Sequence, residues 1–103
     1  MYGTVAKLRV KPGVEDKVIQ DLDRQTSRQP EGFVSGAVYR ADDDPQTLYL
    51  AVVFKSKEAY VKNAETPEQD AEYRKMRELL ESDPEWHDGE VISMMTSETA
   101  TRA

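Results

Sequence analysis

The order of strand and helix patterns along this sequence predicts an α+β fold with a four-stranded antiparallel sheet. Three observations support the prediction. Residues 2–10 alternate between a more apolar and a more polar set, as in a strand that has one covered face. From Val14 the apolar residues recur with a helical period, and two more strands, a second helical region and a last strand follow. This order is that of the ferredoxin-like βαββαβ architecture.

The first strand is expected to place Thr4 and every second residue after it on one face, before a break at 11–13. The first helix is expected to run from Val14 to about Arg28. Glu15 lies in its first turn, where the helix dipole favours an anion, and Pro30 follows its end.

The second and third strands are predicted at Phe33–Ala41 and Thr47–Phe54, joined by the polar hairpin loop 42–46. The third strand carries Leu48, Leu50, Val52 and Phe54 on one face and Tyr49, Ala51 and Val53 on the other. Both faces of this strand are apolar, so both must be covered. Helices cover only one face of such a sheet. A second copy packing sheet to sheet would cover the other and give a dimeric α+β barrel.

The second helical region has two expected starts. Ser56 is a candidate N-cap for a short helix that reaches Ala64. Thr66 is a candidate N-cap for the next helix, with Pro67 at its first position and Gln69 completing a capping box. That helix carries an apolar side formed by Tyr73, Met76, Leu79 and Leu80, and is expected to stop at residues 82–84. The fourth strand is predicted at Glu90–Thr96, after an acidic turn that contains Trp86 and His87.

Composition excludes several classes of function. The 103 residues predict one domain, at 1–96, with a polar C-terminal tail at 97–103. A formal net charge of -6 opposes binding to nucleic acid or to anionic membranes. The chain has no cysteine, which removes disulfides and thiolate chemistry and fits a reducing cytoplasm. Because a strand pattern begins almost at Met1, we expect no signal peptide and a cytoplasmic location.

Four segments of the sequence resemble the antibiotic biosynthesis monooxygenase domain family, which belongs to the dimeric α+β barrels. They are "RVKPGVEDKV", "PEGFVSGAVYR", "LAVVFKSKEAY" and "DPEWHDGEV", and the resemblance covers roughly residues 2–95. It implies a homodimer with a pocket between the helices and the sheet of each subunit. Relatives with known roles oxidise quinols or polycyclic phenols with O₂ and no added cofactor, so the resemblance implies a reaction of this class. Other relatives bind and cleave haem, and here His87 is the only histidine available as a haem ligand.

Two residues are candidates for catalysis. His87 is the only side chain whose ordinary pKa lies near neutrality, so it is a candidate base; alternatively it is a turn residue bonded to Asp88 or to a backbone carbonyl. Asn63 is a candidate to bond a substrate oxygen or O₂, and alternatively it only ends a helix.

A set of apolar and aromatic side chains is predicted to bind the substrate. Trp86 stacks on the ligand in this hypothesis, or alternatively anchors the end of the barrel or the dimer interface. The other members are Tyr39, Phe54, Tyr73 and Met76, which are equally suited to a plain core. No metal site is expected, because Asp42–Asp44 lack the spacing and glycine of a calcium loop and one histidine without cysteine is too few for zinc.

Three functions therefore remain open. The first is a cofactor-independent monooxygenase that oxidises an aromatic or quinol-type molecule with O₂. The second is a non-catalytic dimer that binds a small hydrophobic ligand or serves in a stress response. The third is haem binding.

Overall fold

The structure, a computed structural model, describes residues 1–97 of the chain. Within them the elements follow in the order β1 (Tyr2–Arg9), α1 (Glu15–Ser27), β2 (Phe33–Arg40), β3 (Thr47–Phe54), α2 (Lys57–Ala64), α3 (Pro67–Arg77) and β4 (Glu85–Glu90). The strands form one antiparallel sheet in the order β2-β3-β1-β4. The predicted ferredoxin-like α+β fold is confirmed, with β1 and β3 in the middle of the sheet. Of the predicted tail at 97–103, residues 98–103 lie outside the described part.

The predicted N-caps of the second helical region are confirmed. The Ser56 side chain accepts a hydrogen bond from the backbone N–H of Ala59 at 3.1 Å and opens α2. The Thr66 hydroxyl accepts from the backbone N–H of Gln69 at 3.2 Å and opens α3, with Pro67 at the first helical position. These caps satisfy backbone donors that the first helical turn leaves unpaired.

The last strand lies earlier in the chain than predicted. β4 spans Glu85–Glu90 and pairs with β1, so Trp86 and His87 lie within a strand and not in a turn. The predicted strand at Glu90–Thr96 is wrong, since after Glu90 the chain leaves the sheet. Every residue of β4 is exposed, so the buried alternation that reveals a strand in a sequence is missing here. α3 is also shorter than predicted and ends at Arg77.

The core lies between the sheet and the helices. Ala6, Leu8 and Val10 of the β1 segment are 0% exposed and point toward the helices. They pack in one cluster with buried residues of β3, α1, α3 and the segment after α3, namely Leu48, Leu50, Val18, Leu22, Met76 and Leu80. Burying apolar area of this kind supplies most of the folding free energy, at about 25 cal/mol per Å².

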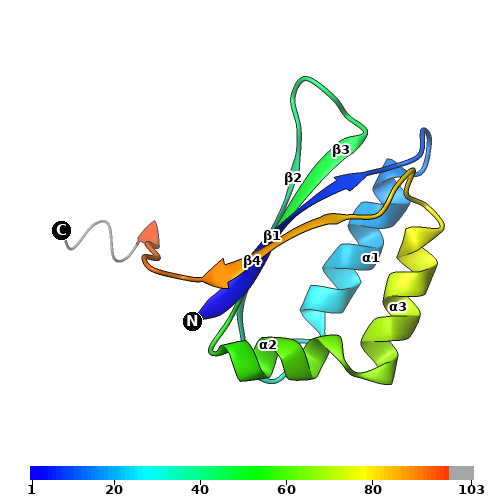
Figure 1. Ribbon diagram of the computed structural model, residues 1–103. Helices are drawn as coiled ribbons and strands as arrows, with labels where there is room; N and C mark the ends of the chain where they lie inside the picture. Colours follow the sequence, from blue (N-terminus) through cyan, green and yellow to red (C-terminus); the bar gives the residue numbers. More distant parts are fainter. Residues whose placement is uncertain (98–103) are drawn as a thin grey trace.

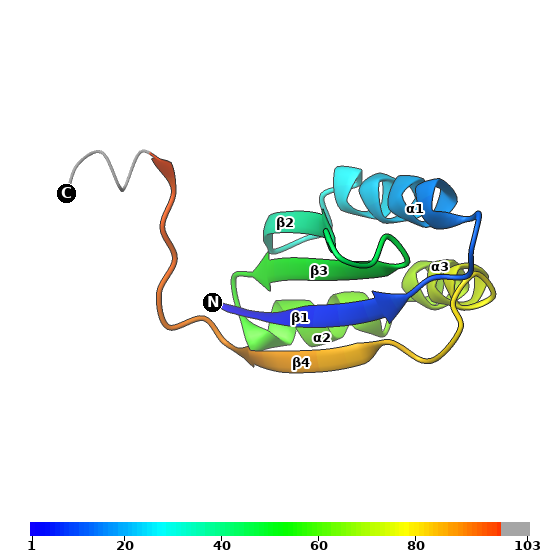
Figure 2. The same cartoon turned by 90° about the horizontal axis from the view of Figure 1, so that it is seen from above.

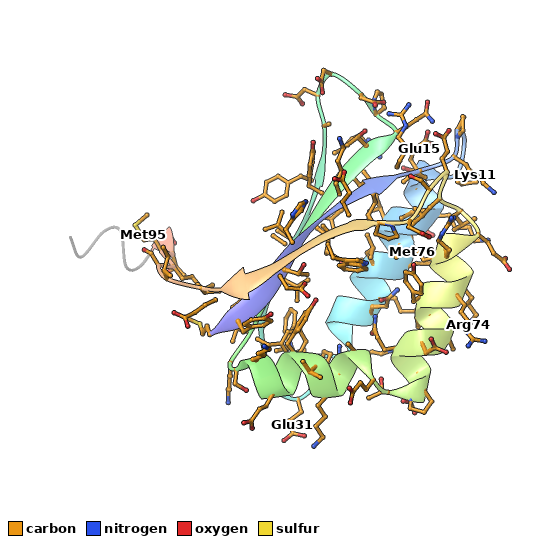
Figure 3. The ribbon with its side chains drawn as sticks, viewed as in Figure 1. Lys11, Glu15, Glu31, Arg74, Met76 and Met95 are labelled. Atoms are coloured by element: carbon orange, nitrogen blue, oxygen red, sulfur yellow. The ribbon has the colours of Figure 1, made fainter. Side chains whose placement is uncertain are left out.

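All three helices lie on the same side of the sheet, and its other face carries no element of the chain (Figure 1). Figure 2 shows the chain after β4 running away from the body. Side-chain orientation follows these layers: Met76 of α3 is 3% exposed and lies toward the sheet, whereas Arg74 points outward (Figure 3). In residues 1–97, no helix has both the length and the apolar character that crossing a membrane requires.

Helices α1 and α3 are joined by one buried carboxylate. Glu72 of α3 is 8% exposed and accepts hydrogen bonds from Arg24 at 2.7 Å and from Arg28 at 3.0 Å. The hydrogen bond from Arg24 holds the pKa of Glu72 below its ordinary value, against the opposing effect of burial. The two arginines thereby fix the helix layer above the sheet.

Gly3 of β1 provides a test of the sheet packing. A Cβ at this position would clash with the backbone carbonyl of Val52 on β3, whereas a Cβ on its β4 partner Gly89 would meet nothing within 4 Å. Gly3→Ala should lower the free energy of unfolding by ~2 kcal/mol. Urea denaturation of Gly3→Ala and of the control Gly89→Ala measures this; equal stabilities would contradict the predicted clash.

Candidate functional site

A cavity of about 130 Å³ lies between the sheet and the helices. Its sheet side is formed by Thr4, Leu50, Val52, Phe54 and Trp86, and its remaining walls by Leu22, Gln25, Pro30, Phe33, Tyr60, Asn63, Ala64, Gln69, Tyr73 and Met76. Five of these side chains are aromatic and none is charged. Such a wall suits an uncharged aromatic ligand, because a charged ligand would lose its hydration without gaining a partner.

Five of the seven predicted site residues line this cavity, namely Asn63, Trp86, Phe54, Tyr73 and Met76. The backbone carbonyl of Asn63 accepts from the hydroxyl of Thr66 at 2.9 Å, so Asn63 takes part in the end of α2. Its side-chain amide makes no hydrogen bond within residues 1–97 and remains able to bind a ligand. The catalytic and binding roles of these residues remain predictions.

The other two predicted residues, His87 and Tyr39, lie away from the cavity. His87 pairs with Val5, whose side chain is on the open face, whereas its neighbour Trp86 pairs with buried Ala6. Successive residues of a strand point to opposite faces, so placing Trp86 at the cavity puts His87 on the far side of the sheet. Tyr39 of β2 is 59% exposed and does not line the cavity either.

The predicted role of His87 as the base therefore finds no support in its position. The sheet separates its imidazole from the cavity. The alternative bond from the His87 side chain to Asp88 is not formed among residues 1–97 either, because successive residues of β4 point to opposite faces and Asp88 bonds to Tyr60 on the helix side.

Sequence reasoning missed the pair formed by Tyr60 of α2 and Asp88 of β4. The Tyr60 hydroxyl donates to Oδ1 of Asp88 at 2.9 Å, and the Tyr60 ring meets the ring of Phe54 edge-on at 5.8 Å. Burial of the phenol, together with the bond to Asp88, raises the pKa of Tyr60 to about 12. Tyr60 is therefore a neutral hydrogen-bonding group at physiological pH and a weak acid. No sequence pattern links two residues that are 28 positions apart.

Two polar atoms at the cavity wall have no hydrogen-bond partner among residues 1–97. They are Oγ1 of Thr4 and Nε2 of Gln25, and both atoms are buried. The Thr4 hydroxyl lies near the phenol of Tyr60 and opposes the rise in the pKa of Tyr60. The two groups nevertheless lack the geometry of a hydrogen bond. An unpaired buried donor costs about 1–3 kcal/mol. The alternation of the first strand predicts the inward direction of Thr4, but the pairing state of its hydroxyl is visible only in the structure.

The part of the chain that the structure describes contains no group of three histidine, cysteine, aspartate or glutamate side chains able to hold a metal ion. The chemistry available at the cavity wall is therefore hydrogen bonding by neutral groups and contact with aromatic rings.

The family model for antibiotic biosynthesis monooxygenase matches residues 1–77. The chain belongs to the antibiotic biosynthesis monooxygenase family. Among curated proteins, none matches this chain.

Solved structures of this family share the fold. A protein from Chloroflexus aurantiacus named as an antibiotic biosynthesis monooxygenase is 25% identical, with a TM-score of 0.80, covering 92% of this chain and 96% of its own. SnoaB from Streptomyces nogalater, a cofactor-independent oxygenase solved as an asparagine-to-alanine variant, is 16% identical, with a TM-score of 0.80 and coverages of 91% and 95%. A family protein from Nitrosomonas europaea is 15% identical, with a TM-score of 0.77 and coverages of 90% and 100%.

The pKa of Tyr60 makes stability depend on alkaline pH. The unfolded chain releases the Tyr60 proton near pH 10, and the folded chain retains it to about pH 12. The free energy of unfolding should therefore be unaffected below pH 10 and fall as pH rises from about 10 to about 12. Denaturation of wild type and Tyr60→Phe across this range measures the difference, and Tyr39→Phe is the exposed control.

An ultraviolet titration of the phenols provides a second measurement. The wild type should show one tyrosine that ionises late, and Tyr60→Phe should lose it. Asp88→Asn should lower the pKa of Tyr60 only in part, because burial is the larger cause. A late tyrosine that persists in Tyr60→Phe would show that the assignment is wrong.

Proposed function

We propose that this protein is a cofactor-independent oxygenase that oxidises an aromatic or quinol-type small molecule with O₂ in the cavity between its helices and sheet. The observation that carries the proposal is the aromatic, uncharged wall around the unpaired amide of Asn63. Family membership and the similarity to SnoaB support the same reaction class. The absence of cysteine agrees with action in a reducing cytoplasm.

The chemistry requires the ligand to lose a proton, become electron-rich and react with O₂ away from bulk water. For a hydroquinone, one oxygen atom of O₂ enters the ring to give a hydroxyquinone and the other leaves as water. The wall contains no histidine, lysine or carboxylate to take the first proton. In this proposal the substrate binds uncharged and then releases its proton to a water molecule, and Asn63 stabilises the anionic oxygen that forms by hydrogen bonding.

The lack of a charged base at the wall also favours a second function. A cavity with only neutral polar groups can hold a hydrophobic ligand without turnover, as a binding or stress-response dimer would. Haem binding finds no support in the cavity, because the only histidine of the chain is on the other face of the sheet.

Oxygen uptake separates catalysis from binding. Wild-type protein treated with a chelator should consume O₂ above the buffer rate with hydroquinones. Asn63→Ala should lower kcat by roughly hundredfold to thousandfold, as expected for losing one donor to a developing anion. His87→Ala should retain the wild-type rate, because its side chain lies on the far face.

The outcomes are distinct. Loss of uptake in His87→Ala would contradict the placement of the reaction in this cavity. No uptake by the wild type on these compounds, together with measurable binding of them, would favour the non-catalytic ligand-binding function.

We further propose that the protein is a homodimer that packs through the open face of the sheet. Val5 is 51% exposed, Tyr39 59% and Tyr49 37%, and half-buried Ala51 and Val53 lie beside them. Contiguous apolar patches of this kind mark interfaces in proteins. A second copy is the occupant we favour, because the segment after β4 extends away from its own subunit with Ile92 91% exposed and Met95 77% exposed.

The dimer proposal is tested by mass measurement in solution. Val5→Lys places a charge in the middle of the open face and should convert a dimer into a monomer, as measured by light scattering. Val61→Lys changes an equally apolar, 38% exposed residue of α2 and should leave the dimer intact. A monomeric wild type at high protein concentration would refute the proposal.

A further inference from the structure

The two unpaired polar atoms of the cavity lie on opposite layers of the fold. Thr4 belongs to β1 and forms part of the sheet wall, and it is only 5% exposed. Gln25 belongs to α1 in the helix layer. A molecule bound between the layers therefore meets Thr4 from one side and Gln25 from the other.

A neighbour holds the side chain of Gln25 and leaves one of its polar atoms free, and the Thr4 hydroxyl has no partner among residues 1–97. The Oε1 atom of Gln25 accepts a hydrogen bond from Nε2 of Gln69 at 3.3 Å, which leaves its own Nε2 unpaired. The Tyr60 hydroxyl donates its hydrogen bond to Asp88, so it does not donate to the Thr4 hydroxyl. Buried polar groups in folded proteins are paired in the great majority of cases, so two unpaired atoms in one cavity point to a bound partner.

The size of the cavity limits that partner. Its volume is about 130 Å³, close to the roughly 150 Å³ of an apolar cavity that accepts benzene. One aromatic ring fills this space, and a second fused ring would extend beyond it. Because no lining side chain is charged, the ring is expected to be uncharged when it binds.

We propose that Thr4 and Gln25 determine ligand specificity, and that the ligand is a single neutral aromatic ring with oxygen substituents at opposite ends. Nε2 of Gln25 donates to one oxygen, and the Thr4 hydroxyl exchanges a hydrogen bond with the other. The inference rests on the proposed function for the location of the ligand. It goes further in restricting the ligand to one ring and in assigning these two contacts.

Calorimetric titration without oxygen tests the assignment with three probes. Hydroquinone has the proposed shape and both oxygens, p-xylene has the same shape without oxygens, and 1,4-dihydroxynaphthalene adds a fused ring. Wild type should bind hydroquinone at least tenfold more tightly than the naphthalene. Thr4→Val and Gln25→Leu should each weaken hydroquinone binding roughly fivefold to tenfold and leave p-xylene binding unchanged, since each removes one hydrogen bond.

Two further variants keep the result interpretable. Thr4→Ser retains the hydroxyl and should restore hydroquinone affinity, whereas Ser35→Ala removes a hydroxyl from another strand and should change nothing. Thr4→Val should also raise the thermal midpoint of the free protein, because it removes an unpaired buried hydroxyl. A midpoint that falls, with hydroquinone affinity unchanged, would overturn the role of Thr4.

Failure of this inference is distinguishable from failure of the oxygenase proposal. Equal affinity for hydroquinone and p-xylene, or tight binding of the naphthalene, would overturn the ligand assignment whatever the oxygen uptake. Hydroquinone binding that depends on Thr4 and Gln25, without oxygen uptake, would support the assignment and reject turnover of this compound.

Discussion

The structure depends on the packing of the inward side chains of β1 against the helix layer. β1 is central in the sheet, paired with β3 on one side and β4 on the other. Ala6, Leu8 and Val10 are completely buried, so their alternation fixes which face of every paired strand looks toward the helices. A shift of one residue in this register would turn the core side chains to the open face. The cavity, the open face and the position of Trp86 all follow from this one register.

The same layers explain why the cavity is polar at only a few points. Part of its wall consists of core residues that also hold the fold together, such as Leu22, Leu50 and Met76. Polar side chains enter it at Thr4 on the sheet and, from the helices, at Gln25, Tyr60, Asn63 and Gln69. The ion pairs from Arg24 and Arg28 to Glu72 join the two helices that carry Gln25 and Gln69. The cavity thus combines stable packing with a small number of neutral polar groups.

The sheet also separates two surfaces of different character. The helix side holds the cavity, and the open side presents Val5, Tyr39, Tyr49 and His87. If the open face forms the dimer, His87 lies in the interface and not in a reaction centre. Trp86 and His87 are adjacent in sequence, yet their side chains lie on opposite faces of the sheet, because successive residues of a strand point to opposite sides.

The sequence by itself determined the order of elements, the helix N-caps at Ser56 and Thr66, and the inward face of β1. These features depend on local periodicity and on side chains bonding to nearby backbone, which a sequence displays directly. It also identified part of the cavity wall, since Phe54, Tyr73 and Met76 lie on the apolar sides of their elements. Only the tertiary structure decided the position of β4, the face that His87 occupies, the Tyr60–Asp88 pair and the unpaired state of Thr4 and Gln25. β4 is an exposed edge strand defined by its pairing with β1, and the other features join residues distant in sequence, so no local pattern records them.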